Sequence, residues 1–178
     1  LQQPHSVYFE TRKPDKHGKG AFEIRDLVRA SLRLRPDRIV VGEIRGGEAL
    51  DLLQAMNTGH DGSMSTIHAN TPIDTLLRLE TCAIMSGIEF PLSAIRAQVA
   101  GALDAIVQTA RLSDGSRKVV TIAEVLPLEK GEYRVREIYG WKTESVTPDG
   151  GLAGRHEVRE APTFLADAQV MHLDLPWT

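Results

Sequence analysis

Apolar residues recur at helical spacing in four stretches of the chain. In the first, which begins at Ile24, they fall on one face, and Pro36 ends the helix because proline disfavours helical geometry at the residue before it. A later stretch has a start signal in which Thr71 caps the helix, Pro72 takes its first position and Asp74 closes a capping box. The predicted helices cover residues 24–32, 47–58, 72–87 and 91–103.

Shorter apolar runs predict strands between and after these helices. Residues 39–41 form a continuous β-branched run, which is typical of a parallel strand covered on both faces. Asp114-Gly115 predicts the turn of a hairpin, and residues 143–154 are predicted to be a loop rich in Gly, Pro and Ser. The predicted strands cover residues 6–10, 38–43, 63–67, 105–112, 118–126 and 133–141.

Helices that alternate with strands and are followed by antiparallel hairpins predict an α/β fold with a mostly parallel central sheet. In such sheets, ligands bind outside the carboxyl ends of the strands. Two places meet this condition: Glu43 with the turn after it, and His68 with Asn70. These two strand ends are therefore the candidate site.

The composition is that of an ordinary globular protein, and it narrows the functional classes. Of the 178 residues, 42% are hydrophobic and 25% are charged, and the formal net charge is -3. This near balance does not indicate a surface for nucleic acid or anionic membranes, so no nucleic-acid partner is expected. Cys82 is the single cysteine, which excludes an intrachain disulfide and a cysteine-rich zinc site and indicates a reducing compartment.

Two sequence features bear on where the protein is located: a membrane-spanning segment and a signal peptide. No apolar run approaches the roughly 18 residues of a spanning helix, and the first residues carry no basic-then-apolar pattern, so a soluble, cytoplasmic protein is predicted. The sequence begins at Leu1 without methionine, and a predicted strand starts already at Ser6. We therefore expect that the chain begins inside a larger domain.

Glu43 is the first candidate for chemistry. It ends an apolar strand, where a carboxylate is desolvated on one side and faces the ligand crevice. Nucleotide hydrolases use a carboxylate in this place to hold magnesium or to polarise water. The alternative is a structural residue that pairs with Arg45 or caps the next helix.

His68 is the second candidate, at the exit of a strand of alternating small and polar residues. An imidazole there can donate a hydrogen bond to a phosphate oxygen and so report whether the terminal phosphate is present. One alternative is a structural histidine. Another is a metal ligand together with His60 and Asp61, although their spacing matches no compact ligand motif.

These segments resemble the secretion ATPases of the type II and type IV superfamily, and most closely the CpaF-type ATPases of tight-adherence and Flp pilus systems. The resemblance covers about residues 1–125 well and the tail weakly. The matching stretches are residues 1–5, 10–12, 25–29, 34–49 and 53–70.

The resemblance implies a RecA-like ATPase fold in which Glu43 stands in an atypical Walker B box and His68 in the His box of residues 65–70. It implies a full-length parent that uses ATP and Mg²⁺ as a homohexameric motor for pilus assembly or type II/IV secretion. The implied partner is an inner-membrane platform protein, and the implied location is the cytoplasm, peripheral at the bacterial inner membrane.

Two of the four signature boxes of these ATPases are missing from the sequence. A phosphate-binding loop follows G-x-x-x-x-G-K-[ST], but Gly18-Lys19 is followed by Gly20, and no glycine stands five residues before Gly18. The family's acidic Asp box would lie upstream of Leu1. We therefore expect this chain by itself neither to bind ATP and Mg²⁺ tightly nor to hydrolyse ATP.

By the same resemblance, residues 1–142 are the carboxyl-terminal part of a RecA-like motor domain, and residues 143–178 are a loop and a tail without assigned structure. Oligomeric motors complete a site with a guanidinium from a neighbouring subunit. Arg12 and Arg45 are the candidates for this role, and ordinary surface charge is the alternative for each.

Two other functional classes stay open at this point. The first is a non-catalytic interaction module that keeps only the family's assembly surface. The second is a metal-dependent hydrolase that uses His60, Asp61 and His68.

Overall fold

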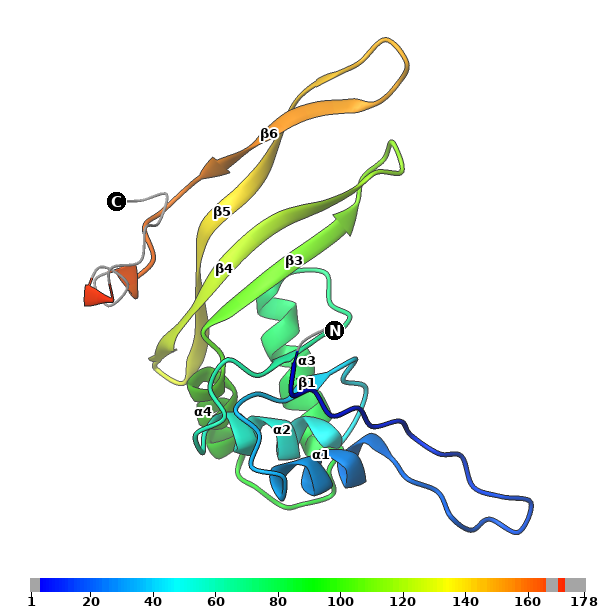
Figure 1. The fold of residues 1–178 in the computed structure, drawn as a ribbon. Coiled ribbons are helices and arrows are strands. Elements are labelled where there is room, and N and C mark those ends of the chain that lie inside the picture. The colour runs from blue at the N-terminus through cyan, green and yellow to red at the C-terminus, as the bar shows by residue number, and fades with distance from the viewer. Residues whose placement is uncertain (1–3, 166–169, 172–178) are drawn as a thin grey trace. The chain divides into compact units, whose positions relative to one another are not determined.

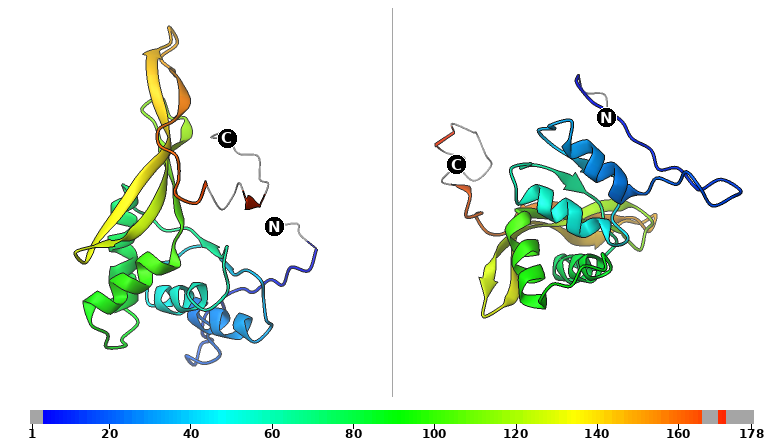
Figure 2. Two further views of the ribbon diagram at one scale, coloured as in Figure 1. Left: turned by 90° about the vertical axis from the view of Figure 1, so that its left-hand side faces the viewer. Right: turned by 90° about the horizontal axis from the view of Figure 1, so that it is seen from below.

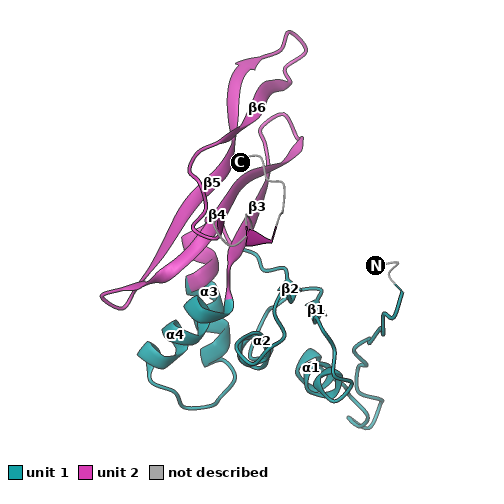
Figure 3. Ribbon diagram, turned by 60° about the vertical axis from the view of Figure 1, so that its left-hand side comes forward, with its two compact units in different colours: residues 1–68, 77–102 teal, residues 69–76, 103–178 magenta. Residues whose placement is uncertain are grey.

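The computed structural model describes residues 4–165, 170 and 171 (Figures 1 and 2). The chain forms two compact units (Figure 3). The first consists of the residues up to His68 together with Leu77–Ala102, and the second consists of Ala69–Leu76 together with the residues from Leu103 onward. The boundaries between these units differ from the domain boundary predicted after residue 142. That domain boundary stays a prediction.

Four helices occupy the stretches in which apolar residues recur at helical spacing. They are α1 (Ile24–Leu32), α2 (Glu48–Met56), α3 (Pro72–Ile84) and α4 (Leu92–Ala102). Two parts of the start signal of α3 are confirmed, because Pro72 is its first residue and the Thr71 hydroxyl oxygen accepts a hydrogen bond from the Asp74 backbone N–H over 3.1 Å. The capping box that Asp74 would close stays a prediction. Most predicted boundaries agree with the observed ones to within one residue. The exceptions are the end of α2, predicted two residues too late, and the end of α3, predicted three residues too late, where the last turns leave helical geometry.

A short parallel sheet in the first unit joins β1 (Val40–Val41) to β2 (Met64–Ser65). Val41 is buried, whereas Val40 and its cross-strand partner Met64 are about half exposed. The prediction that this strand is covered on both faces is therefore wrong for the described chain. A β-branched run fits a strand that is buried on both faces as well as one that is exposed on one face. The length of the strand depends on the neighbouring strand with which it pairs.

The core of the first unit lies under α2. Ala49, Leu50, Leu52, Leu53 and Ala55 of this helix are all at most 2% exposed. Side chains from the other helices and from the residues around β1 complete the buried set, namely Val28, Ile39, Val41, Ile44, Leu79, Cys82, Ala83, Ile95 and Val99. A helix that is apolar on nearly all sides is typical of a central element.

The strand predicted over residues 6–10 is not formed among the described residues. Val7 and Tyr8 are exposed and extended, and no neighbouring strand pairs with them. The chain instead makes an arm that is closed by a single antiparallel bridge between Arg12 and Phe22. Alternating apolar residues supply strand propensity, but a strand also needs a partner for its backbone groups.

The second unit is built on a four-stranded antiparallel sheet in the order β3-β4-β5-β6. Its strands are β3 (Ala105–Arg111), β4 (Arg117–Glu129), β5 (Glu132–Val146) and β6 (Leu152–Val158). The hairpin predicted at Asp114-Gly115 joins β3 to β4, and Gly115 there has a φ of 83° that favours glycine.

The loop predicted over residues 143–154 is largely wrong. β5 continues to Val146 and β6 starts at Leu152, so that only a tight turn separates them. Thr147 closes this turn, because its backbone N–H donates to the Gly151 carbonyl oxygen over 2.8 Å. The Gly, Pro and Ser content indicated the turn correctly, but it could not show that the two strands extend into the predicted loop from both sides.

The α/β class and the presence of a parallel sheet followed by antiparallel hairpins are confirmed. Among the described residues the larger sheet is the antiparallel one, and the parallel sheet has two strands. No helix in the described ranges is both long enough and apolar enough to cross a membrane.

The packing of α2 predicts a large effect of truncating one core side chain. Leu53→Ala should lower the free energy of unfolding by about 2–5 kcal/mol, because Leu53 is 2% exposed and its removal leaves a cavity. Urea unfolding followed by the helical circular dichroism signal measures this. Leu34→Ala is the matched control at 56% exposure and should change stability by less than about 0.5 kcal/mol. Equal effects of the two substitutions would contradict the placement of the core.

Candidate functional site

Glu43 follows β1 and pairs with two cationic or potentially cationic side chains. Its Oε2 lies 2.6 Å from Nη2 of Arg45, and its Oε1 lies 3.1 Å from Nε2 of His68. The Glu43 side chain is 24% exposed, whereas that of His68 is 86% exposed. The sequence placed Glu43 and His68 at neighbouring strand ends, and this juxtaposition is confirmed. The structural alternative, a pair with Arg45, is also present.

Backbone pairing beyond β1 and β2 brings the two strand ends together. The Met64 N–H donates to the Ile39 carbonyl oxygen over 3.0 Å at one end of the pair. At the other end, the Ile44 N–H donates to the Thr66 carbonyl oxygen over 2.9 Å. The Thr66 hydroxyl donates to the Gly42 carbonyl oxygen over 2.6 Å, immediately before Glu43. Because the strands are parallel, Glu43 and His68 leave the sheet at the same edge.

The turn after Glu43 is closed by Glu48, in the first turn of α2. Glu48 Oε1 accepts hydrogen bonds from the backbone N–H of Arg45 over 2.7 Å and from that of Gly46 over 3.0 Å. A carboxylate at a helix N-terminus is favoured by the unpaired N–H groups there. Glu48 therefore fixes the backbone from which the Arg45 side chain reaches Glu43.

The electrostatics of the site keep Glu43 ionised. The hydrogen bond from Arg45 is the largest effect on the pKa of Glu43 and lowers it; partial desolvation, the next largest, raises it, and the nearby Arg45, His68 and Arg78 side chains lower it further, so that the pKa is lowered overall. The same bond to Glu43 raises the pKa of Arg45. A lowered carboxyl pKa means that the ion pair between Glu43 and Arg45 is intact above the ordinary glutamate pKa and is lost as the pH falls through the lowered value.

The residues of the metal alternative do not come together. His60 Nδ1 lies 3.1 Å from the Ala55 carbonyl oxygen, and Asp61 is exposed. Across the described ranges, no three His, Cys, Asp or Glu side chains are arranged to hold a metal ion. The hydrolase alternative that uses His60, Asp61 and His68 therefore finds no assembled site there.

Arg12 and Arg45 line one hollow of the first unit, with a volume of about 560 Å³. Arg12 lies on the arm, where its Nε donates to the Gly20 carbonyl oxygen over 2.6 Å and its guanidinium lies 4.8 Å from the centre of the Phe22 ring. Arg25 also lines the hollow, together with apolar side chains such as Met85. The two arginines selected from the sequence thus face one space.

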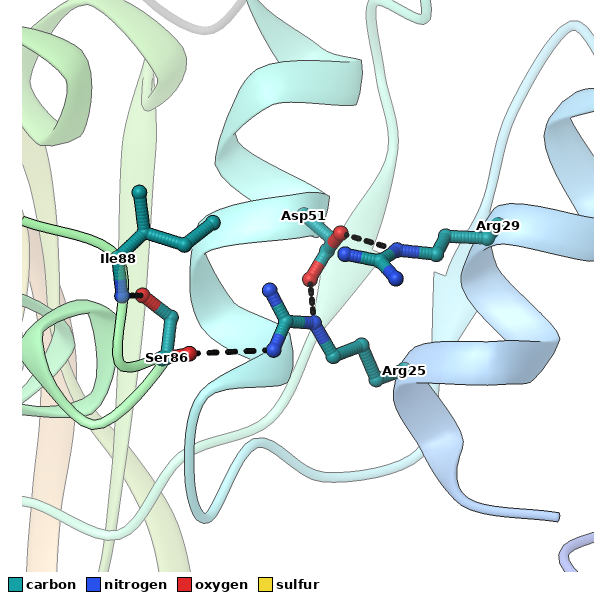
Figure 4. Close-up of polar contacts among 5 residues, drawn as sticks. All are labelled: Arg25, Arg29, Asp51, Ser86 and Ile88. Carbon is teal, nitrogen blue, oxygen red and sulfur yellow. Dashed lines mark hydrogen bonds and ion pairs between the residues drawn. The ribbon is translucent and has the colours of Figure 1, made fainter.

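The sequence analysis missed an arrangement of three charged residues beside this hollow. Asp51 on α2 pairs with Arg25 and Arg29 of α1 (Figure 4). The signal was an aspartate with leucines on both sides, Leu50 and Leu52, in a largely apolar helix, since a buried carboxylate needs cationic partners. Helical spacing put the two arginines four residues apart on one face of α1, as ion-pair partners to a neighbouring helix would be.

Residues 2–167 match the family model described as "Type II/IV secretion system protein". The chain belongs to this family. It is similar to a putative conjugal transfer protein of Mycobacterium tuberculosis, with 38% identity over 152 residues that cover 85% of this chain and 42% of that protein. It is also similar to the type IV secretion system protein PtlH of Bordetella pertussis, with 37% identity over 110 residues, which cover 60% of this chain and 32% of that protein.

Among solved structures, the VirB11 ATPase of the Brucella suis type IV secretion system, in complex with sulphate, superimposes on this family member. The TM-score is 0.54 at 30% identity, over 58% of this chain and 32% of that one. The chain therefore spans well under half of the length of these relatives. The resemblance of the sequence to the type II/IV secretion superfamily is therefore confirmed.

The charge state of Glu43 gives a direct test of the site in this secretion-family chain. In the wild type, the Glu43 carboxyl should titrate below the ordinary glutamate pKa of about 4.3 because Arg45 stabilises its charged form. Arg45→Gln should move the midpoint upward, as followed by NMR of the side-chain carboxyl carbon. Arg134→Gln is the matched control, since Arg134 pairs with Glu129. A midpoint that stays in place when Arg45 is replaced would contradict this assignment.

Proposed function

We propose that this chain is part of a hexameric motor that hydrolyses ATP to drive pilus assembly or type II/IV secretion, and that Glu43 and His68 belong to its nucleotide site. The observation that supports the proposal best is the contact between Glu43 and His68 at one edge of a parallel sheet. The comparisons add that similar proteins are named as secretion components and, for VirB11, as an ATPase.

Glu43 is suited to the atypical Walker B role because it is ionised and incompletely buried. Carboxylate oxygens are the donors that Mg²⁺ prefers, so the residue fits the ion, which neutralises phosphate charge when bound. The carboxylate can also orient an attacking water by accepting its proton in a hydrogen bond. Arg45 binds the Glu43 Oε2 atom and so fixes the direction in which the other carboxylate oxygen, Oε1, points.

His68 is suited to sensing the terminal phosphate. Its ring is largely exposed and touches Glu43 through Nε2. A phosphate oxygen that accepted the Nε2 proton would release Glu43 from this contact, which would link phosphate occupancy to the freedom of the carboxylate. The sequence position of His68 in the His box agrees with this role.

Arg12 or Arg45 is proposed to stabilise the phosphates across a subunit interface. Both line the hollow, and a guanidinium can bind phosphate oxygens in a bidentate manner. Arg12 is the better candidate for a role across subunits, because Arg45 already pairs with Glu43 of its own chain.

For the whole protein, we propose a CpaF-type motor that is located in the cytoplasm at the inner membrane and acts on a membrane platform protein. ATP and Mg²⁺ would be its cofactors. The relatives named for conjugal transfer and type IV secretion agree with the broader class.

A non-catalytic interaction module is the second candidate. One observation favours it: both Glu43 oxygens are already paired within the chain, as a purely structural carboxylate would be. In that case the chain would keep the family's assembly surface without turnover.

The experiment that decides between the two candidates is Glu43→Gln in the whole protein. This change keeps the size of the side chain and removes its charge, so ATP hydrolysis should fall by about a hundredfold or more while ATP affinity changes little. Steady-state phosphate release and calorimetric titration measure the two quantities. Glu89→Gln is the matched control, since Glu89 is exposed on the loop before α4. Wild-type turnover in Glu43→Gln would remove Glu43 from the mechanism.

The 178-residue chain by itself should show no tight binding of ATP with Mg²⁺ and no turnover. Most of the affinity for a triphosphate comes from phosphate-loop N–H groups, the loop lysine and the metal ion, and this sequence encodes no such loop. Calorimetric titration and a phosphate-release assay test this expectation. Micromolar affinity with steady turnover would show that the nucleotide site is built differently.

A further inference from the structure

We propose that Asp51 and Arg25 are positioning residues that hold the turn of Arg45–Gly47 in place and thereby set how Arg45 meets Glu43. The proposal rests on the proposed function only for its consequence in catalysis. Its geometric part concerns contacts within the first unit and stands by itself.

Asp51 is the centre of the arrangement (Figure 4). Its side chain is 10% exposed, and each of its oxygens takes one arginine. Oδ2 accepts from Arg25 Nε over 2.7 Å, and Oδ1 accepts from Arg29 Nε over 2.8 Å. α1 is thereby attached to the central helix α2 at two points.

A buried carboxylate of this kind is not explained by stability alone. Desolvation of the charges offsets much of their attraction, and apolar replacements of such pairs are often as stable. What an ion pair adds is a fixed geometry, because each bond has a direction. The geometry of Asp51 therefore points to a role in positioning the backbone that its arginine partners contact.

Arg25 reaches beyond Asp51 to the end of α3. Its Nη1 donates to the Ser86 carbonyl oxygen over 3.2 Å, so that one guanidinium connects α1, α2 and the residues after α3. Figure 4 shows this arginine between Asp51 and Ser86.

Ser86 in turn lies against the turn that carries Arg45. A Cβ on Gly47 would lie 2.7 Å from the Ser86 Cα and 2.9 Å from its N, so only glycine fits there. Gly47 precedes α2, the helix that holds Asp51. The contacts form a closed ring: from the turn to Ser86, to Arg25, to Asp51 and back along α2 to the turn.

This ring of contacts fixes the position of the backbone from which Arg45 reaches Glu43. Glu48 ties the Arg45 and Gly46 N–H groups to the start of α2, and the Arg45 guanidinium reaches Glu43 from that backbone. A shift between α2 and the end of α3 would therefore move Arg45 relative to Glu43.

Arg29 provides the matched comparison. It pairs with the same carboxylate as Arg25 over nearly the same distance, and among the described residues its hydrogen bonds reach no further than Asp51. If the cluster only attached α1 to α2, the two arginines would be equivalent. If it positions the turn, only Arg25 matters to Glu43.

The test is NMR titration of the Glu43 carboxyl in Arg25→Lys and Arg29→Lys, both confirmed as folded by circular dichroism. Arg25→Lys keeps the charge but cannot span both Asp51 and Ser86, so the Glu43 midpoint should rise toward the ordinary glutamate value. Arg29→Lys should leave the midpoint near that of the wild type.

A second pair of variants approaches the ring from the turn. Gly47→Ala places a methyl group against Ser86 and should raise the Glu43 midpoint in the same direction as Arg25→Lys. Gly42→Ala is the control, because a Cβ there meets no atom within 4 Å although it is adjacent to Glu43. This pair keeps the test decisive if Arg25→Lys does not fold.

The outcomes are distinct. Upward shifts confined to Arg25→Lys and Gly47→Ala would support the proposal. Equal shifts in Arg29→Lys, or a Glu43 midpoint that none of the four variants moves, would overturn it. These titrations need no nucleotide, so they stand even if the whole protein does not hydrolyse ATP.

In a whole protein that does hydrolyse ATP, Arg25→Lys should lower kcat by about tenfold, within the range by which a small misplacement slows catalysis. Arg29→Lys should stay within about twofold of the wild type. Equal losses of kcat in the two variants would contradict the positioning role.

Discussion

The candidate site depends on the parallel pairing of two strands of two residues each. Because β1 and β2 run in the same direction, Glu43 and His68 leave the sheet at one edge and meet over 3.1 Å. The pairing is short, and hydrogen bonds outside the strands extend it, from the Ile44 N–H and from the Thr66 hydroxyl. A slip of one residue would turn His68 to the other face and separate the pair.

The second constraint is the packing of the turn after Glu43. Arg45 reaches Glu43 from a backbone that Glu48 closes and that Ser86 supports from the other side. Asp51 pairs with Arg25, which lines the same hollow as Arg12 and Arg45 and donates to the Ser86 carbonyl oxygen. The site therefore lies at the end of a short parallel sheet, next to the turn that leads into the largely apolar helix α2.

Much of this could be predicted from the sequence, and the failures have physical reasons. Helices were found because apolar spacing along α1 to α4 is a local signal. The strand expected over residues 6–10 and the loop expected over residues 143–154 were wrong, since pairing between strands is not encoded locally. Glu43 and His68 were selected because strand ends are general ligand sites, whereas the Asp51 cluster joins residues far apart in the chain.

The central claim is that Glu43 and His68 act as one unit in ATP hydrolysis. A double-mutant cycle on kcat of the whole protein tests it most directly, with Glu43→Gln, His68→Gln and the combined variant. Residues that act as a unit give strongly non-additive effects, so the double variant should be about as slow as the slower single variant. Losses of kcat that multiply in the double variant would show that the two residues act independently and would contradict the account.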